Sequence, residues 1–311
     1  MNALPRLIVI LGPTATGKSS LGITLAERLG GEILVCDSTQ VYRRFDIGTA
    51  KVPAEEQRGI PHHLVDLVDP EAVFTAGDFR REALGVLDDL RRRGKPPILT
   101  AGTGLYLRAL LQGLADAPAR SEVLRERLRQ RVSRKGPEYL HKLLTHLDPD
   151  SAARIGPLDT QKIIRALEMR LLVGKTVGEI HRTGRAPLEG YHVVKIGLLP
   201  PRPALYSRID ARAEAMLAAG WLDEVRQLIA SGVPPDAKPF QFIGYSQLRE
   251  HLSGRLPLKE AIAQIQQATR QFAKRQITWF RKEQDVHWLS GFGDDSGIAS
   301  STLEILPAGN V

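Results

Sequence analysis

A glycine-rich stretch near the amino end of the chain carries the clearest chemical signal in the sequence. Residues 12–19 match the pattern G-x-x-x-x-G-K-[ST] and lie between an apolar run, Arg6 to Leu11, and a segment of helical spacing, Leu21 to Leu29. In such a loop, backbone N–H groups wrap a phosphate, a lysine neutralises its charge and a hydroxyl can ligate Mg²⁺. The expected phosphate-binding residues are Gly12, Pro13, Thr14, Ala15, Thr16, Gly17, Lys18 and Ser19, with Ser19 as the magnesium ligand. They indicate a diphosphate or triphosphate ligand and leave the reaction open, and a turn without a ligand is the alternative.

Two further polar residues directly follow predicted strands. Asp37 comes after the apolar segment Glu32 to Cys36, and Thr103 lies just beyond the buried segment Pro97 to Ala101. Because ligands of parallel α/β sheets bind at the carboxyl ends of the strands, we expect both side chains beside the glycine-rich loop. Asp37 could act there as a general base, a hydrogen-bond acceptor or a metal ligand through water. Each residue could instead cap a following turn or helix, and the local sequence leaves this open.

A long basic helix is predicted from Leu258 to Lys282. It carries six basic residues against one acidic residue, Glu260, and its cations Arg270, Lys274 and Arg281 fall near one face. A row of cations at helical spacing suits a phosphate backbone. A solvated surface helix is the alternative.

The remaining pattern predicts the elements that must position these residues. Strands at Arg6 to Leu11, Glu32 to Cys36, Leu64 to Val68, Pro97 to Ala101 and His192 to Leu198 alternate with helices, which predicts a parallel sheet covered on both faces, a P-loop NTPase-like α/β fold. Residues 119–190 read as an all-helical insert with 15 Lys and Arg against 9 Asp and Glu. We therefore expect a core of residues 1–118 and 191–290, the insert at 119–190, and a flexible tail at 291–311.

Composition excludes several classes of protein. The 311 residues have 42% hydrophobic content and a formal charge of +8, which is ordinary for a globular chain and favours phosphate-rich partners. A single cysteine, Cys36, rules out an intrachain disulfide and a cysteine-based zinc site, and no apolar run is long enough to span a membrane. A reducing cytoplasm and a monomer are expected. His62 and His63 lack partners at metal-ligand spacing and are interpreted as structural.

Several motifs together resemble one family. They are Gly-Pro-Thr-Ala-Thr-Gly-Lys-Ser (12–19), Asp-Ser-Thr-Gln-Val-Tyr (37–42), Asp-Ile-Gly-Thr-Ala-Lys (46–51), Pro-His-His-Leu (61–64), Gly-Thr-Gly-Leu-Tyr (102–106) and Lys-Arg-Gln-Ile-Thr-Trp-Phe-Arg (274–281). In this order they resemble the tRNA dimethylallyltransferase family, of bacterial type since the chain cannot build a cysteine-based zinc finger. The resemblance implies transfer of a dimethylallyl group from its diphosphate to N6 of the adenosine immediately 3′ of the anticodon, in tRNAs that read codons beginning with U. Mg²⁺ comes with that reaction.

The resemblance also implies roles for individual residues. The loop would hold dimethylallyl diphosphate in place of ATP, with Arg212 on the leaving diphosphate. Asp37 would accept a hydrogen bond or proton from the adenine N6, and Thr103 would help to place that amine. The residues expected to contact the tRNA anticodon stem-loop are Asp37, Ser38, Thr39, Gln40, Arg125, Gln161, Lys162, Ile163, Ile164, Arg165, Lys274, Arg275, Gln276, Thr278, Trp279 and Arg281. The helical insert and the basic helix would together hold the RNA.

Three other functions use the same loop. In a P-loop kinase for a small molecule or nucleotide, the loop binds ATP and Asp37 activates an acceptor hydroxyl. A prenyltransferase acting on free AMP needs no platform for RNA, and a noncatalytic RNA-binding switch needs no base. The basic insert and the basic helix have no role in the kinase or in the AMP prenyltransferase, and Asp37 and Thr103 have no role in the RNA-binding switch.

Overall fold

A parallel sheet forms the core of the computed structural model, which describes residues 4–115, 117–182 and 186–306. Within these residues six strands pair in the order β3-β2-β4-β1-β5-β6, and each pair is parallel. The strands are β1 (Arg6–Leu11), β2 (Glu32–Cys36), β3 (His62–His63), β4 (Pro97–Ala101), β5 (His192–Leu198) and β6 (Val286–Leu289). The strands β1, β2 and β4 are almost wholly buried, which is why their sequences are continuous apolar runs. The P-loop-like α/β fold is thereby confirmed.

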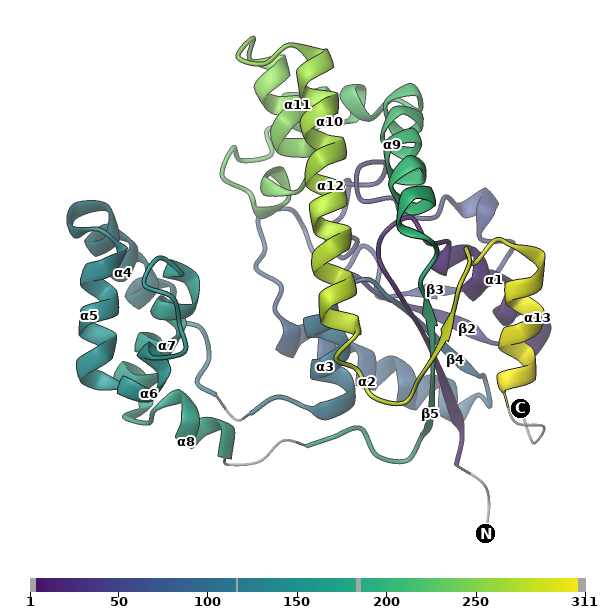
Figure 1. Ribbon diagram of the computed structural model, residues 1–311, viewed down its shortest axis with the longest axis horizontal. Helices are drawn as coiled ribbons and strands as arrows, with labels where there is room; N and C mark the ends of the chain where they lie inside the picture. The colour runs from purple at the N-terminus through teal and green to yellow at the C-terminus, as the bar shows by residue number, and fades with distance from the viewer. Residues whose placement is uncertain (1–3, 116, 183–185, 307–311) are drawn as a thin grey trace. The chain divides into compact units, whose positions relative to one another are not determined.

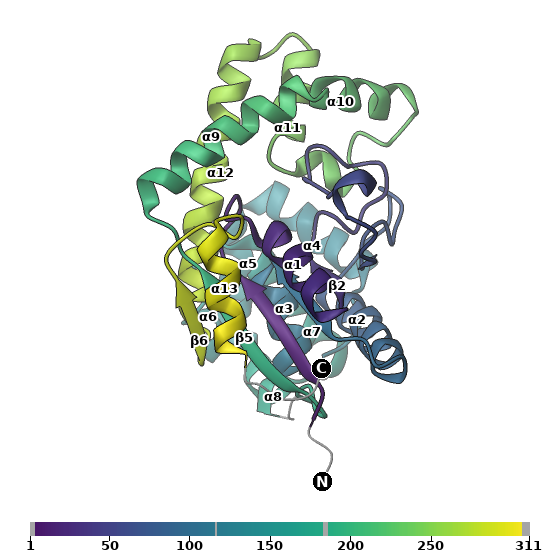
Figure 2. The same cartoon turned by 90° about the vertical axis from the view of Figure 1, so that its right-hand side faces the viewer.

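Helices cover both faces of the sheet, as Figure 1 and Figure 2 show. One face carries α1 (Lys18–Leu29) and α13 (Ser296–Ile305), whose buried residues join one core cluster with Ile10, Ile33 and Ile196. The other face carries α2 (Ala76–Arg92) and α3 (Gly104–Gln112). A Thr75–Asp78 capping box starts α2. The sheet is therefore covered on both faces, as expected for its continuous apolar strands.

A second group of helices follows β5 in the chain. It comprises α9 (Arg202–Ala218), α10 (Trp221–Ala230), α11 (Tyr245–Leu252) and the long α12 (Leu258–Phe280), with short 3₁₀ turns η1 (Ala54–Glu56) and η2 (Lys238–Gln241) elsewhere in the same unit. Phe45, Trp221, Phe240 and Tyr245 pack together in its core, Tyr245 against Phe45 with ring centroids 4.8 Å apart. The segment after β2, which contains Phe45, is therefore packed against α10 and α11.

Residues 111–188 form a separate compact unit, while residues 1–110 and 189–311 form the other. The helical unit contains α4 (Glu122–Lys135), α5 (Pro137–Leu147), α6 (Pro149–Ala152), α7 (Thr160–Val173) and α8 (Val177–Arg182). Its own core contains Leu128, Leu140, Leu144 and Leu167. A core of its own lets this unit fold around its own apolar residues.

Two expectations from the sequence differ from the structure. The strand expected at Leu64 to Val68 is replaced by the two-residue β3, because Leu64 and Asp66 have positive φ (69° and 54°), which breaks an extended run, and only Val68 pairs, with Tyr42. The tail expected to be flexible from residue 291 is ordered as far as 306, since α13 packs on the α1 side of the sheet; residues 307–311 lie outside the described part.

Candidate active site

The loop between β1 and α1 has the geometry of a phosphate cradle. Its backbone turns through positive φ at Ala15 (63°) and Gly17 (79°), and the Thr16 hydroxyl donates a 2.9 Å hydrogen bond to the Pro13 carbonyl. The Lys18 ammonium donates to the same carbonyl at 2.8 Å, so the side chain folds back over the loop. Gly293 N–H fixes the outer side of the loop by donating to the Thr16 carbonyl at 2.8 Å. These three hydrogen bonds hold the loop in a curled shape of the kind that surrounds a bound anion.

Burial lowers the pKa of two cations at this loop, Lys18 and Arg212. Burial lowers the pKa of Lys18 to about 8, with the Asp37 carboxylate opposing that shift and the Arg212 guanidinium adding to it. The pKa of Arg212 is lowered as well, by burial and by Arg208, against the effect of Asp37. In the part of the chain that the structure describes, Arg212 makes neither a hydrogen bond nor an ion pair. Paired cations whose charged forms are disfavoured form a site that an anion would stabilise.

Asp37 and Thr103 meet at the carboxyl ends of β2 and β4. The register pairs Cys36 with Ala101, so the next residues of both strands are neighbours, and the Gly102 and Thr103 N–H groups both donate to the Cys36 carbonyl at 3.1 Å. The Thr103 hydroxyl accepts from Ser38 N–H at 3.0 Å. One oxygen of Asp37 caps the local turn, accepting from the Thr39 N–H at 2.8 Å and its hydroxyl at 2.7 Å. Its other oxygen, Oδ2, has no hydrogen-bond partner among the described residues and is available to a substrate.

Gln276 joins the two halves of the site. Its side chain is 7% exposed, its Oε1 accepts from Thr14 N–H at 2.8 Å, and its Nε2 donates to the Gly102 carbonyl at 2.8 Å. The helix α12 therefore touches both the phosphate loop and the turn that carries Thr103. A cradle for a phosphate, a free carboxylate oxygen and a hydroxyl thus lie along one edge of the sheet.

Comparison with known proteins identifies the family. The family model described as IPP transferase matches residues 40–283. The chain belongs to the IPP transferase family. It is 50% identical over 306 residues to a tRNA dimethylallyltransferase of Koribacter versatilis (strain Ellin345), covering 97% of this chain and 98% of the relative. It is 49% identical over 298 residues to one of Solibacter usitatus (strain Ellin6076), covering 96% and 97%.

Solved structures of the IPP transferase family share the fold. The full-length tRNA isopentenylpyrophosphate transferase from Bacillus halodurans superposes with a TM-score of 0.70 at 37% identity, covering 97% of this chain and 96% of that one. A eukaryotic dimethylallyltransferase, described as acting on tRNA, has a TM-score of 0.82 at 29% identity, covering 97% of this chain and 78% of that one. The resemblance of the sequence motifs to the tRNA dimethylallyltransferase family is confirmed.

The residues expected to contact RNA divide into exposed and buried groups. Lys274, Arg275 and Thr278 on α12 are exposed, as is Arg281 directly after the helix. Gln276 points inward instead, and Trp279 packs its indole against Gly104, where an added Cβ would lie 2.1 Å from the ring. Arg270, counted with the same row of cations, is paired with Asp210. Of the basic residues expected to contact RNA on this segment, those without an ion pair among the described residues lie at the end of the helix and just past it.

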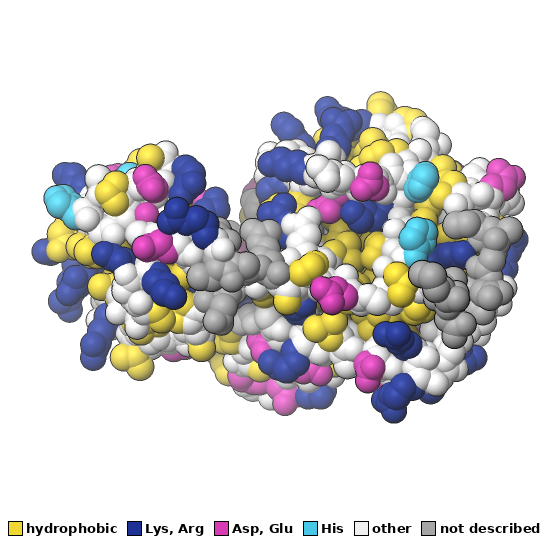
Figure 3. All heavy atoms as spheres, turned by 90° about the horizontal axis from the view of Figure 1, so that it is seen from below, with side chains coloured by type: hydrophobic (Ala, Val, Ile, Leu, Met, Phe, Trp, Pro, Cys, Tyr) yellow, Lys and Arg dark blue, Asp and Glu magenta, His cyan; other side chains and the backbone are white. Residues whose placement is uncertain are grey.

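In the helical unit the expected contacts are also divided. Gln161 and Lys162 are exposed, whereas the Ile163 and Ile164 side chains are 0% and 5% exposed in the core of the unit, so neither offers a surface to RNA. Arg125 and Arg165 both bind the buried carboxylate of Glu168. Burial raises the pKa of Glu168, and the hydrogen bonds from Arg125, Ser121 N–H and Arg165 outweigh it and bring the value to about 2. Many Lys and Arg side chains cover the unit's face in Figure 3.

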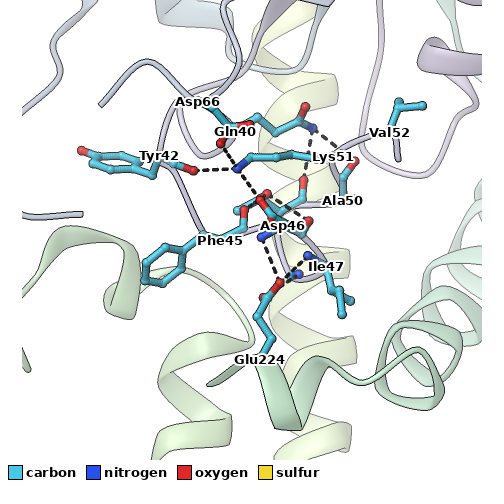
Figure 4. Close-up of polar contacts among 12 residues, drawn as sticks. Gln40, Tyr42, Phe45, Asp46, Ile47, Ala50, Lys51, Val52, Asp66 and Glu224 are labelled. Carbon is cyan, nitrogen blue, oxygen red and sulfur yellow. Dashed lines mark hydrogen bonds and ion pairs between the residues drawn. The ribbon is translucent and has the colours of Figure 1, made fainter. Parts of the chain in front are cut away.

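A network that sequence reasoning missed holds the segment after Asp37. Figure 4 shows Lys51, whose ammonium donates to the Tyr42 carbonyl at 2.7 Å and bridges Asp46 and Asp66. The amide of Gln40 donates to the Thr49 carbonyl at 3.1 Å. The motif 46–51 was visible in the sequence and contains Asp46, but Tyr42 and Asp66 lie outside it, 9 and 15 residues from Lys51. Spacing alone therefore could not assign Lys51 this role.

Glu224 fixes the same segment from α10. Its carboxylate accepts from the N–H groups of Asp46 at 3.0 Å and Ile47 at 2.7 Å (Figure 4). It also accepts from the Tyr245 hydroxyl at 2.6 Å. One carboxylate thus holds the turn that follows Tyr42.

Proposed function

We propose that the chain transfers a dimethylallyl group from dimethylallyl diphosphate to N6 of the adenosine immediately 3′ of the anticodon, in tRNAs that read codons beginning with U. The observation that carries the proposal is the meeting of the Lys18 loop with the free Asp37 oxygen at one edge of the sheet. The names of its relatives, tRNA dimethylallyltransferases at up to 50% identity, support the same reaction.

The loop and its two cations would bind the diphosphate. An adenine amine is a weak nucleophile, because its lone pair is delocalised into the ring, so the leaving group must carry much of the catalytic burden. As the bond between the allylic carbon and the diphosphate oxygen breaks, its electron pair stays on the diphosphate, where Lys18 and Arg212 stabilise the growing charge. Burial strengthens both interactions relative to water.

Asp37 and Thr103 would handle the amine. The N6 lone pair forms the new bond to the allylic carbon, and the N6 proton passes to Asp37 Oδ2, the oxygen not used in the local turn. Thr103, beside Ser38, orients the amine toward the carbon. Both reactants are held in one geometry, which contributes to the rate independently of proton transfer.

The donor set fits a magnesium ion carried with the diphosphate. Ser19 follows Lys18, and its hydroxyl makes no hydrogen bond to another described residue. Within the described residues no group of three His, Cys, Asp or Glu could form a closed metal site. Mg²⁺ prefers oxygen ligands and is commonly bound through substrate phosphates, water and one or two protein oxygens. Ser19 would therefore hold the ion, which would neutralise charge on the diphosphate.

RNA would be held by exposed cations outside the site. Lys274, Arg275 and Arg281, on and just beyond α12, suit the phosphates of an anticodon stem-loop. In the helical unit Lys162 is exposed, and its ammonium is already paired with Asp159. A stacked base hides its N6, so the target nucleotide has to leave the stack to reach Asp37. Of the expected RNA contacts, Ile163 and Ile164 are buried in the core of the helical unit and Gln276 is buried beside the phosphate loop, so these three serve the fold.

A labelling experiment tests the function. The protein is incubated with Mg²⁺ and dimethylallyl diphosphate labelled in the allyl group, with unmodified tRNA or AMP as the acceptor, and separately with γ-labelled ATP. We expect label on tRNA, its loss when the target adenosine is replaced by guanosine, and none on AMP. Label on AMP, or phosphoryl transfer from ATP, would instead support the nucleotide prenyltransferase or the kinase.

A further inference from the structure

Gln276 occupies an unusual position for an amide side chain. It lies on the buried stripe of α12 with Ala273, Ile277 and Phe280, where an apolar residue would be expected. Both ends of its amide are used, the oxygen on Thr14 N–H and the nitrogen on the Gly102 carbonyl, each at 2.8 Å. A buried amide with two long-range partners holds two backbone segments at one separation.

The two segments belong to different parts of the site. Thr14 lies inside the phosphate loop, four residues before Lys18. Gly102 precedes Thr103, its N–H donates to the Cys36 carbonyl at 3.1 Å, and a Cβ added to it would lie 2.7 Å from Asp37 Oδ2. On one side the amide thus contacts the diphosphate cradle, and on the other the turn packed against the carboxylate.

The helix that carries Gln276 is itself firmly held. Ala273 and Ile277 pack with Ala15 of the phosphate loop and with Leu205 and Ile209 of α9, the helix that also carries Arg212. In Figure 1 the C-terminal half of α12 runs beside α3. A shift of the amide would therefore be resisted by packing on both sides.

We infer that Gln276 is a positioning residue that sets the distance between the diphosphate cradle and the Asp37–Thr103 pair. The inference rests on the proposed function, in which the electrophile lies at the first and the amine at the second. A misplacement of about 1 Å between reacting groups can cost about 10²-fold in rate without a comparable loss of binding. The residue acts through Thr14 and Gly102 and touches neither substrate.

The variant Gln276→Glu gives a signature specific to this role. A protonated carboxyl group can donate to the Gly102 carbonyl and accept from Thr14 N–H, as the amide does, whereas a carboxylate cannot donate. Burial and the nearby Asp37 carboxylate raise the pKa of the introduced group, and the cations Lys18 and Arg212 of the same site oppose that shift. At a position that is only 7% exposed, burial is the larger effect and keeps the pKa above that of an ordinary Glu. The transfer rate of the variant relative to the unaltered protein should therefore rise as pH falls, by up to about tenfold per pH unit above that pKa.

The matched control is Gln271→Glu, the same change on the exposed face of the same helix. Single-turnover transfer to tRNA is measured from pH 6 to 9 with both substrates saturating, alongside diphosphate affinity and thermal melts. A second variant, Gln276→Met, removes both hydrogen bonds at every pH. We expect it to lower the transfer rate by about 10²-fold, with diphosphate affinity changed less than fivefold.

The outcomes separate the inference from the proposed function. If the unaltered protein and the Gln271 control transfer no label to tRNA, the proposed function fails. If they transfer it normally and folded Gln276→Met keeps a rate within threefold of theirs, the positioning role is overturned. A pH-independent rate ratio for Gln276→Glu overturns it equally, because a purely structural amide would change only the melting temperature.

Discussion

The depressed pKa of Lys18 predicts how diphosphate binding depends on pH. The value falls from the ordinary 10.5 to about 8, with burial as the largest cause. Only the protonated ammonium attracts the diphosphate, so apparent affinity is reduced by the fraction of protein that is protonated. With a pKa of 8 that fraction is about one in eleven at pH 9 and about one in a hundred at pH 10. The dissociation constant should be level below pH 8 and rise about tenfold per unit above it.

The assay is titration calorimetry with dimethylallyl diphosphate and no RNA, so that no acceptor consumes the ligand. The terminal phosphate, with a pKa near about 6, is already ionised across this range. Because Arg212 lowers the pKa of Lys18, Arg212→Met should move the break to higher pH, although it also weakens binding. Asp37 raises that pKa, so Asp37→Asn should move the break to lower pH.

A flat dissociation constant up to pH 9.5 in protein that is still folded would refute the reasoning. Lys18 would then titrate like an exposed lysine, and the loop would not desolvate it. Lys18→Met provides the complementary result, since its weaker binding should show no break near pH 8.

Three other predictions address separate parts of the chain. Asp37→Ala should lower turnover by about 10²–10⁴-fold with diphosphate affinity nearly unchanged, and an equal loss of affinity would make Asp37 a metal ligand or a structural cap. Each of Lys274→Ala and Arg281→Ala should reduce the slope of log tRNA affinity against log salt by roughly 0.7–0.9, and an unchanged slope in folded variants would move the RNA surface elsewhere. Glu168→Gln leaves two arginines without their carboxylate and should destabilise residues 111–188 by about 3 kcal/mol, measured by hydrogen exchange of that unit. The stability from Glu168 should be complete above about pH 4.3, its unfolded pKa, and be lost as pH falls toward 2.

The chemistry of the strand ends was predictable because it is local. A glycine-rich loop with lysine and serine in register follows one apolar strand, and Asp37 and Thr103 follow two others. The carboxyl ends of parallel strands must share one edge, so their meeting follows from the fold class alone. What spacing could not give was which oxygen of Asp37 the local turn uses.

The direction of side chains on α12 was less predictable. Periodicity favoured an apolar stripe of Ile262, Ile265, Ala268 and Phe272, but of these four only Ile265 is fully buried. The C-terminal half of the helix instead buries Ala273, Ile277 and Phe280, and Gln276 lies on the same stripe. A polar residue at a buried helical position signals a specific hydrogen bond, since leaving its amide unpaired would be costly. That signal was present in the sequence. The resemblance of residues 274–281 to the family, however, led to the prediction that Gln276 faces outward and contacts RNA.

Contacts made across long stretches of chain account for the remaining differences. The tail from residue 291 is rich in glycine and serine, which favours a loose chain, yet Asp294 pairs with Arg208 at 2.8 Å and Gly293 N–H bonds the phosphate loop. Both partners are far away in the sequence, where neither composition nor periodicity can detect them. The tail is therefore part of the site's support.

The strand order explains why the site needs the whole sheet. In the sheet β4 lies between β1 and β2, although β2 precedes β4 in the sequence. The chain therefore forms β2, which ends at Asp37, before β4, which ends at Thr103, pairs between β2 and β1. The strand β5 then pairs with the other edge of β1 and is followed by α9, which carries Arg212. Groups from residues 12 to 212 thus become neighbours only when β4 and β5 have both paired with β1. An isolated amino-terminal fragment ending before β5 would hold the loop, Asp37 and Thr103 but neither Arg212 nor Gln276, so it would lack both the second cation and the amide that ties the loop to the carboxylate.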